Sequence, residues 1–199
     1  CKYGGGKLGL IIIGDSHAQA VVTAAKKSLP SDDMHVLEFA QPTCGTIFGV
    51  ESVSGENKFC SVNKVFEDLK KYDKSIPVVI VNRLPYYFHG QNEKAYAEPE
   101  WYVRYKYQDN VSKFREEMNK AIVETACAFA DYRQVYMMRP IPELKVDVLS
   151  AMGRSHAIFG ESRRVSISWD EYQARTSLAR QAQDEAVQKC GVKLLDPTP

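Results

Sequence analysis

The segment Gly14-Asp15-Ser16-His17 places a serine hydroxyl where nucleophilic chemistry could occur. A serine becomes a nucleophile only where it is exposed, near a base, and near donors that stabilise the oxyanion that forms. Ser16 follows an apolar run at residues 8–13 and precedes a helical pattern at residues 18–29, so its N–H should lie at a helix N-terminus. The pattern predicts a nucleophile, with a simple N-cap at Asp15 or Ser16 as the alternative.

Two further hydrogen-bond donors are expected at the ends of neighbouring strands. One is a backbone N–H near Gly45, after the second predicted strand, and the other is the side-chain amide of Asn82, after the third. Sites in parallel α/β sheets lie at the carboxyl ends of the strands, so these groups should meet near Ser16. Together with the N–H of Ser16 they would form an oxyanion hole. Arg83 is a rival donor, and a surface or salt-bridged arginine is its alternative interpretation.

The elements that must position these groups alternate between strand and helix. Continuous apolar or alternating runs predict strands, and apolar residues at helical spacing predict helices. The predicted strands are 8–13, 35–40, 77–82, 134–139 and 192–195, and the predicted helices are 18–29, 61–69, 110–131 and 168–190. This alternation predicts a parallel sheet covered by helices on both faces, with the site at the carboxyl ends of its strands.

Length and charge narrow the classes of function. A chain of 199 residues is long enough for one sizeable core, so we expect a single domain over residues 1–199. The formal net charge is +1 and no long run of one sign occurs, so we expect no nucleic-acid partner. The longest apolar run is far shorter than a membrane span.

Five cysteines stand at positions 1, 44, 60, 127 and 190. Cys44 and Cys60 lie in one Gly/Ser-rich excursion, where a bridge could staple a loop, so we expect a disulfide between them. Cys127 falls within the helical pattern of residues 110–131 and is predicted to be a small buried apolar residue. Cys1 and Cys190 remain unassigned. With no Cys-x-x-Cys pair or Cys/His cluster, we expect no metal site and no cofactor.

The run Ile-Ile-Ile-Gly-Asp-Ser-His-Ala at residues 11–18 resembles the first block of the SGNH/GDSL hydrolases, in particular the SGNH domains fused to membrane acyltransferase-3 proteins that O-acylate bacterial surface glycans. The loop Pro42-Thr-Cys-Gly45 with Cys60 downstream is similar to that subfamily's second block, although Gly45 stands where a proline often follows the cysteine. The third block departs from the Gly-x-Asn-Asp form, because the strand ends in Val81-Asn82-Arg83-Leu84. The resemblance implies a three-layer α/β/α fold with a flavodoxin-like parallel sheet of about five strands.

The family's general base is a histidine in an Asp-x-x-His segment, which the resemblance places after the fifth strand. This chain ends at Asp196-Pro-Thr-Pro199 without it, so we expect that segment to be missing from the sequence, with a degenerate, binding-only relative as the alternative. His17 is expected to pack or to bond rather than to act as the base. His35 is expected at the wrong end of its strand, and His89 and His156 on loops.

The resemblance implies an O-acetyltransferase domain in which Ser16 carries an acetyl group to a hydroxyl of a surface polysaccharide. The alternatives are a carbohydrate acetylesterase with the same nucleophile, and a glycan-binding relative. The implied partners are a fused membrane acyltransferase domain and a glycan, and the implied location is the periplasmic side of an inner-membrane protein. We expect the isolated domain to be monomeric. Asp15, His17, Arg83, Tyr86 and Tyr87 are candidate substrate contacts, with anchoring of a long loop as the alternative role of the aromatic residues.

Overall fold

The computed structural model describes residues 1–55, 60–94, 97–160 and 164–198. Its main sheet has six strands in the order β1-β3-β2-β5-β7-β8. The strands are β1 (Lys2–Tyr3), β2 (Lys7–Gly14), β3 (Met34–Ala40), β5 (Val78–Val81), β7 (Val135–Met138) and β8 (Lys193–Leu195). All neighbouring strands are parallel except β1, which pairs antiparallel with β3 at one edge. The five parallel strands follow the flavodoxin-like order, which confirms the predicted fold class.

The described helices include the four predicted ones and two that were not predicted. The six are α1 (Ser16–Lys27), α2 (Val62–Leu69), α3 (Leu84–His89), α4 (Val111–Ala130), α5 (Val148–Phe159) and α6 (Trp169–Cys190). A capping box between Ser168 and Glu171 begins α6, as predicted. A small antiparallel pair, β4 (Glu51–Ser52) with β6 (Trp101–Tyr102), lies outside the main sheet.

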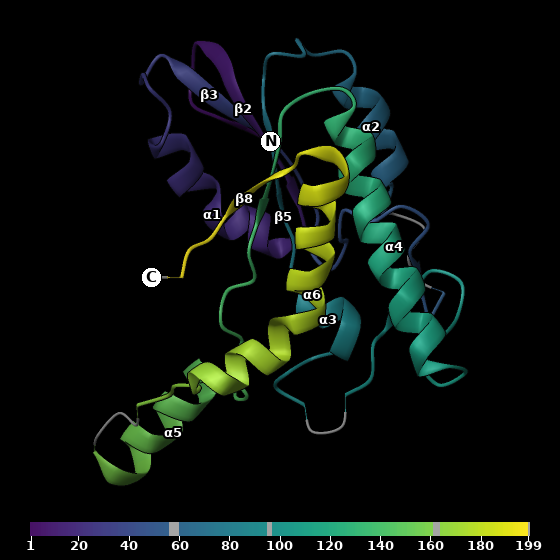
Figure 1. The fold of residues 1–199 in the computed structure, drawn as a ribbon. Coiled ribbons are helices and arrows are strands. Elements are labelled where there is room, and N and C mark those ends of the chain that lie inside the picture. The colour runs from purple at the N-terminus through teal and green to yellow at the C-terminus, as the bar shows by residue number, and fades with distance from the viewer. Residues whose placement is uncertain (56–59, 95–96, 161–163, 199) are drawn as a thin grey trace.

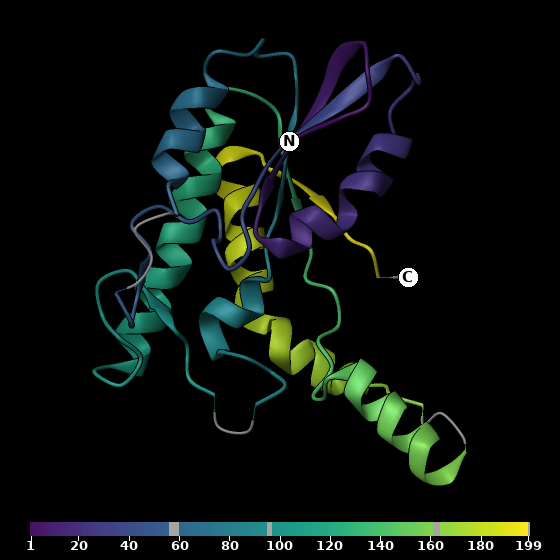
Figure 2. The ribbon, with the colours of Figure 1, turned by 180° about the vertical axis from the view of Figure 1, so that it is seen from behind.

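The helices are divided unequally between the two faces of the sheet. Figures 1 and 2 show α1 alone on one side and α2, α4 and α6 together on the other. Strand β2 contributes side chains to the core on each face of the sheet. Ile12 packs in the core beneath α1, and Ile11 and Ile13 pack in the larger core beneath the other helices. All three side chains are 1% exposed or less. Burial on both faces explains why the run is continuously apolar.

Two disulfides staple the described part of the chain. The predicted Cys44–Cys60 bridge is present and closes the loop between β3 and α2. The prediction for Cys127 was wrong: it forms a second disulfide with Cys190, which joins α4 to the end of α6. These helices lie side by side over the sheet, so a pair separated by 63 residues in sequence meets in space. Cys1 is free and exposed.

Helix α5 projects from the body of the molecule, together with the beginning of α6 (Figures 1 and 2). Its side chains include exposed apolar ones, such as Leu149 and Ile158. It begins at the N-cap Asp147, whose carboxylate accepts from the N–H of Ser150, and ends at Gly160 in the left-handed conformation. Within the described residues, no helix combines the length and apolar character that crossing a membrane requires.

Candidate active site

Ser16 is the first residue of α1 and lies directly after the central strand β2. Its side chain is exposed, and its N–H belongs to the first turn, where backbone donors have no partner within the helix. The turn depends on Gly14, which has φ of +154°, and a Cβ at this position would lie 1.8 Å from the carbonyl oxygen of Val81. No other residue type fits at Gly14, so the close contact between β2 and β5 fixes where Ser16 emerges.

The buried side chain of Asp15 fixes this turn through hydrogen bonds. It is 2% exposed and caps α1, with its Oδ1 accepting from the N–H of His17 at 2.9 Å. Its Oδ2 accepts from the N–H of Arg83 at 2.7 Å and, at 3.5 Å, from the hydroxyl of Tyr87. One buried carboxylate therefore connects the Ser16 turn to the end of β5 and to α3.

Ser16 borders a small pocket of about 110 Å³. Its lining comes from three segments that the fold brings together, namely the Ser16 turn, the loop after β3 and the region of α3: Asp15, Ser16, Thr43, Arg83, Tyr86, Tyr87 and Gln91. Of the candidate substrate contacts, the structure thus places Asp15, Arg83, Tyr86 and Tyr87 around Ser16. His17 lies in a neighbouring pocket that shares Arg83 as a wall.

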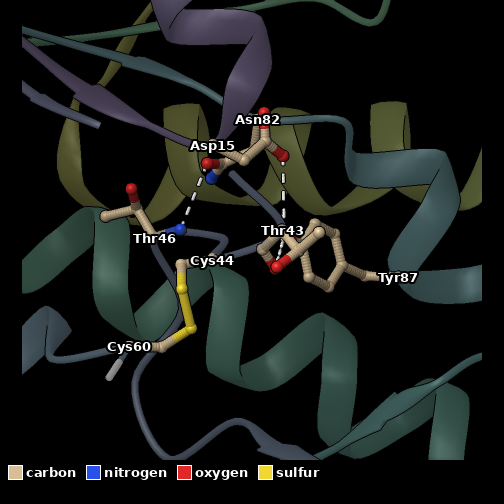
Figure 3. Close-up of a disulfide and its surroundings, with 7 residues drawn as sticks. All are labelled: Asp15, Thr43, Cys44, Thr46, Cys60, Asn82 and Tyr87. Carbon is tan, nitrogen blue, oxygen red and sulfur yellow. Dashed lines mark hydrogen bonds between the residues drawn. A yellow bond between two sulfur atoms is a disulfide. The ribbon is translucent and has the colours of Figure 1, made fainter. Parts of the chain in front are cut away.

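Neither of the two expected donors from other strand ends is among the described residues that line the Ser16 pocket. Asn82 is buried, and its Oδ1 accepts from the backbone N–H of Thr46 at 3.1 Å, a bond that does not use its Nδ2 donors. Figure 3 shows this bond together with the Cys44–Cys60 disulfide, which holds the loop that carries Thr46. Gly45 does not line the Ser16 pocket but a neighbouring one beside α2.

Tyr87 fills the space between the Ser16 turn and this loop. Its side chain is completely buried, and its one hydroxyl proton is shared between the carbonyl oxygen of Thr43, at 3.1 Å, and the more distant Oδ2 of Asp15. Burial and the charge of Asp15 raise the pKa of Tyr87 well above its ordinary value, while a hydrogen bond from the backbone N–H of Gly45 acts in the opposite direction. A Cβ at Gly45 would lie 2.5 Å from the ring, so the loop needs glycine here.

Thr43 adopts a strained backbone conformation in the wall of the Ser16 pocket. Its φ is 64°, and it is the single non-glycine residue with positive φ in the described ranges. A β-branched residue disfavours this region, and such strain persists only where the surroundings impose it. The bond from Tyr87 to its carbonyl and the adjacent Cys44–Cys60 disulfide supply that constraint.

Arg83 is held by two carboxylates at the boundary of the pocket. Its Nε donates to Glu143 at 2.5 Å, and its Nη2 donates to both oxygens of Glu93, at 2.9 and 3.1 Å. Burial disfavours this charge, but Glu143 and Glu93 outweigh it and raise the pKa of Arg83 above its ordinary value. The structure thus shows the salt bridges of the alternative interpretation, and a role for Arg83 as an oxyanion donor or substrate contact stays a prediction. Glu143 is itself 7% exposed and accepts a second bond, at 2.7 Å, from Arg175 of α6.

Glu143 and Arg175 were not among the predicted site residues. Their partners lie 60 and 32 residues away in sequence, counted from Glu143 to Arg83 and to Arg175. Nothing in the local pattern around either residue indicates such a pairing. The nearest signal is the position of Glu143 in the segment after β7, at the carboxyl edge of the sheet, where sites are expected.

The four histidines lie in different places. His17 has its Nδ1 3.5 Å from Oδ1 of Asp15, and His35 lies near the start of β3, away from the site, as expected. His89 is the last residue of α3 and His156 lies within α5, so their predicted placement on loops was wrong. The lining of the Ser16 pocket, as far as the structure describes it, includes no imidazole.

The aromatic residues after β5 are mainly core. Tyr87, Phe88 and Trp101 are 2% exposed or less, and Tyr86 is 7% exposed. The Tyr87 ring packs against Tyr86 and Trp101 at centroid distances of 5.4 and 6.0 Å. The rings thus anchor the connection after β5 to the body, as the alternative interpretation proposed. Tyr86 donates to Glu100 at 2.7 Å, and burial, with Glu100, raises the pKa of Tyr86 to about 12.

Fold and site together define a three-layer α/β protein that presents a serine at the turn from its central strand into a helix. The model of the SGNH domain family, described as fused to AT3 domains, matches residues 1–199, and the chain belongs to this family. No curated protein matches the chain. Among solved structures, it is similar to the periplasmic domain of a lipopolysaccharide acetyltransferase from Salmonella ser. Paratyphi A. The TM-score is 0.58 at 12% identity, covering 98% of this chain and 67% of that chain.

Proposed function

We propose that this chain is the acyl-transferring domain of an O-acetyltransferase, which passes an acetyl group to a hydroxyl of a bacterial surface polysaccharide, lipopolysaccharide O-antigen or similar. Membership of a family fused to AT3 domains supports a membrane acyltransferase domain as its partner. The solved neighbour is described as the periplasmic domain of a lipopolysaccharide acetyltransferase, which supports a periplasmic location. Two disulfides fit an oxidising compartment.

The observation that carries the proposal is the position of Ser16. It is exposed at the N-terminus of α1, where backbone donors and the helix dipole stabilise a developing negative charge. The buried Asp15 carboxylate fixes the turn through bonds to His17 and Arg83, so the serine has a defined place in its pocket. A solvated surface serine needs no such support.

In this proposal the oxyanion hole is formed by the N–H of Ser16, Nδ2 of Asn82 and the N–H of Gly45. The bond from Thr46 to Oδ1 of Asn82 orients that amide and leaves its Nδ2 for an oxyanion. The N–H of Gly45 interacts with the Tyr87 hydroxyl, so it would join the hole only by turning away from the phenol. The Cys44–Cys60 bridge limits how far that loop can move.

The proposed reaction has two balanced halves. The Ser16 hydroxyl attacks the carbonyl carbon of an acetyl donor, its proton passes to a base, and the donor's leaving group departs with a proton. The acceptor hydroxyl then attacks the Ser16 ester, forms the acetylated sugar and returns a proton to the serine. With water as acceptor, the same steps would release acetate. We propose that the base is an imidazole from elsewhere in the full-length protein, because none lines the described pocket of Ser16.

The test uses the full-length protein with an acetyl donor and a polysaccharide acceptor. Ser16→Ala should abolish acetylation of the glycan. Ser112→Ala is the matched control, because Ser112 is also an exposed serine in the first turn of a helix, and it should retain activity. Unchanged turnover in Ser16→Ala would contradict both the transferase and the esterase and favour a glycan-binding relative. Persistent free acetate without acetylated glycan would identify an esterase.

A further inference from the structure

A second pocket adjoins the Ser16 pocket on the other side of Arg83. It has a volume of about 310 Å³ and is formed by the start of α1, by Glu93 and by the segment that leads into α5. Its lining residues are His17, Arg83, Glu93, Pro142, Glu143, Leu144, Val146, Asp147 and Val148. His17 follows Ser16 directly in sequence, so the two pockets meet at the N-terminus of α1.

The two pockets differ in what they can hold. Ligand pockets for small organic molecules measure roughly 300 to 1,000 Å³, whereas one water occupies about 30 Å³ of liquid. The Ser16 pocket, at about 110 Å³, suits a group of a few atoms such as an acetyl group. The larger pocket reaches the size of a site for a sugar ring.

The wall between the pockets is firmly held. Glu143 and Glu93 each form a salt bridge with the Arg83 guanidinium, and Arg175 of α6 forms a further salt bridge with Glu143. Asn92 adds a bond from its Nδ2 to the carbonyl oxygen of Glu143 at 2.7 Å. A wall built in this way keeps both pockets in a fixed relation to Ser16, which is what transfer between two bound groups needs.

The chemistry of the larger pocket favours an uncharged or amino sugar. Pro142, Leu144 and Val146 offer apolar surface to the C–H faces of a ring, and carboxylates accept from hydroxyl groups. Among the residues that the structure describes, the lining contains three carboxylates, Glu93, Glu143 and Asp147, and one guanidinium, that of Arg83. Arg175 contacts Glu143 but is not part of the lining. A carboxylate on the ligand would therefore meet repulsion.

We propose that this pocket binds the acceptor sugar next to the Ser16 ester and selects neutral or amino sugars over acidic ones. The inference rests on the proposed function, because it assigns the acceptor subsite of the same reaction. It gives the segment between β7 and α5 a role in choosing the substrate. It also makes Glu93 a determinant of specificity, since this carboxylate is partly exposed at the pocket while bonded to Arg83.

The test uses the full-length protein with three methyl glycosides, those of galactose, galactosamine and galacturonic acid. Val146→Trp fills the pocket, and we expect the ratio of transfer to hydrolysis with the galactoside to fall about tenfold or more. Val111→Trp is the matched control, because Val146 and Val111 are similarly exposed, at 43% and 38%. Val111→Trp should leave the ratio unchanged.

A second comparison in the same assays tests the selection by charge. The unmodified protein should use the galactoside and the galactosaminide in preference to the galacturonide, and Glu93→Gln should raise relative use of the galacturonide about threefold to fivefold. Equal transfer by Val146→Trp and Val111→Trp, or a preference for the galacturonide, would overturn the assignment. If Ser16→Ala is inactive in the same assays, either of these two results overturns the pocket assignment alone. If Ser16→Ala is active, the proposed function itself is overturned.

Discussion

Asp15 shows how a single residue can organise a site. Its carboxylate has three donors from three segments, the N–H of His17, the N–H of Arg83 and the hydroxyl of Tyr87. Only the first of these is an ordinary N-cap bond. The other two connect β5 and α3 to the turn, so the position of Ser16 depends on contacts that an exposed helix cap would not have.

Replacing Asp15 should therefore cost more than replacing a simple cap. Asp15→Ala leaves buried donors unpaired, and we expect the free energy of unfolding to fall by about 2–4 kcal/mol. Asp147→Ala is the matched control, since Asp147 caps α5 from an exposed position and should cost about 1 kcal/mol. Urea denaturation of both variants measures the difference. Equal losses would show that Asp15 is no more than a cap.

Residues in local patterns could be predicted, and residues with distant partners could not. Asp15 and Ser16 follow a buried strand and precede a helix, so their positions were predictable from the neighbouring residues. Asn82 was placed correctly at its strand end, but its bond to Thr46 depends on a loop 36 residues away. Glu143 could not be predicted from its neighbours beyond its position after β7, because its importance comes from two arginines on other segments.

At the scale of elements, α3 connects the site to the helical layer. His89, its last residue, lies near Arg175 of α6 and Arg115 of α4. Burial, with these two charges, lowers the pKa of His89 to about 4. The imidazole is therefore neutral in the folded protein at neutral pH, and its buried Nε2 has no hydrogen-bond partner among the described residues.

His89 should make stability fall in mild acid. A histidine whose pKa is 6.5 when unfolded and about 4 when folded binds its proton more readily in the unfolded chain. The contribution of the neutral imidazole to stability is complete above the pKa of the unfolded state. It is lost as the pH falls toward and through the pKa of the folded state. Urea denaturation at about pH 7.5 and about pH 5 gives the drop in the free energy of unfolding between the two. We expect this drop to be smaller for His89→Gln than for the unmodified protein. His156→Gln, on exposed α5, is the control, and an identical loss in all three proteins would contradict the assignment.

The same scale shows which elements sequence patterns miss. Long periodic helices such as α4 and buried strands such as β2 were predicted within a few residues of their observed ends. Helix α3 has six residues, including Tyr86, Tyr87 and Phe88, and aromatic residues favour strands, so nothing in its pattern indicated a helix. Helix α5 has both end signals, Asp147 and Gly160, but it projects from the body, and none of its described side chains is buried.

For the whole molecule, the two disulfides have different consequences. Cys127–Cys190 joins two helices of the same layer and lies within or beside the core. Cys44–Cys60 closes the loop that carries Gly45 and Thr46 next to Asn82. The first staples the scaffold, whereas the second shapes the site. The Cys127 pairing could not be predicted because the adjacency of α4 and α6 is a property of the fold.

Removing each bridge should separate these roles. The chain-entropy estimate gives a loss of about 4 kcal/mol for Cys127→Ala with Cys190→Ala, and about 3 kcal/mol for Cys44→Ala with Cys60→Ala. Under conditions in which both double variants remain folded, we expect only the Cys44→Ala, Cys60→Ala variant to be impaired in acetyl transfer. Denaturation and transfer assays on the two double variants measure both effects. These roles would be contradicted if removal of Cys127–Cys190 impaired transfer by the folded protein more than removal of Cys44–Cys60 does.

The central claim for the molecule is that Ser16 carries the acetyl group. The most direct measurement is mass spectrometry of the full-length protein, incubated with an acetyl donor in the absence of an acceptor glycan and quenched in acid. We predict one acetyl group per protein, mapped to the peptide that contains Ser16, absent in Ser16→Ala and lost when the glycan is added. Acetylation of the glycan by a protein that never carries acetyl on Ser16 would contradict the account.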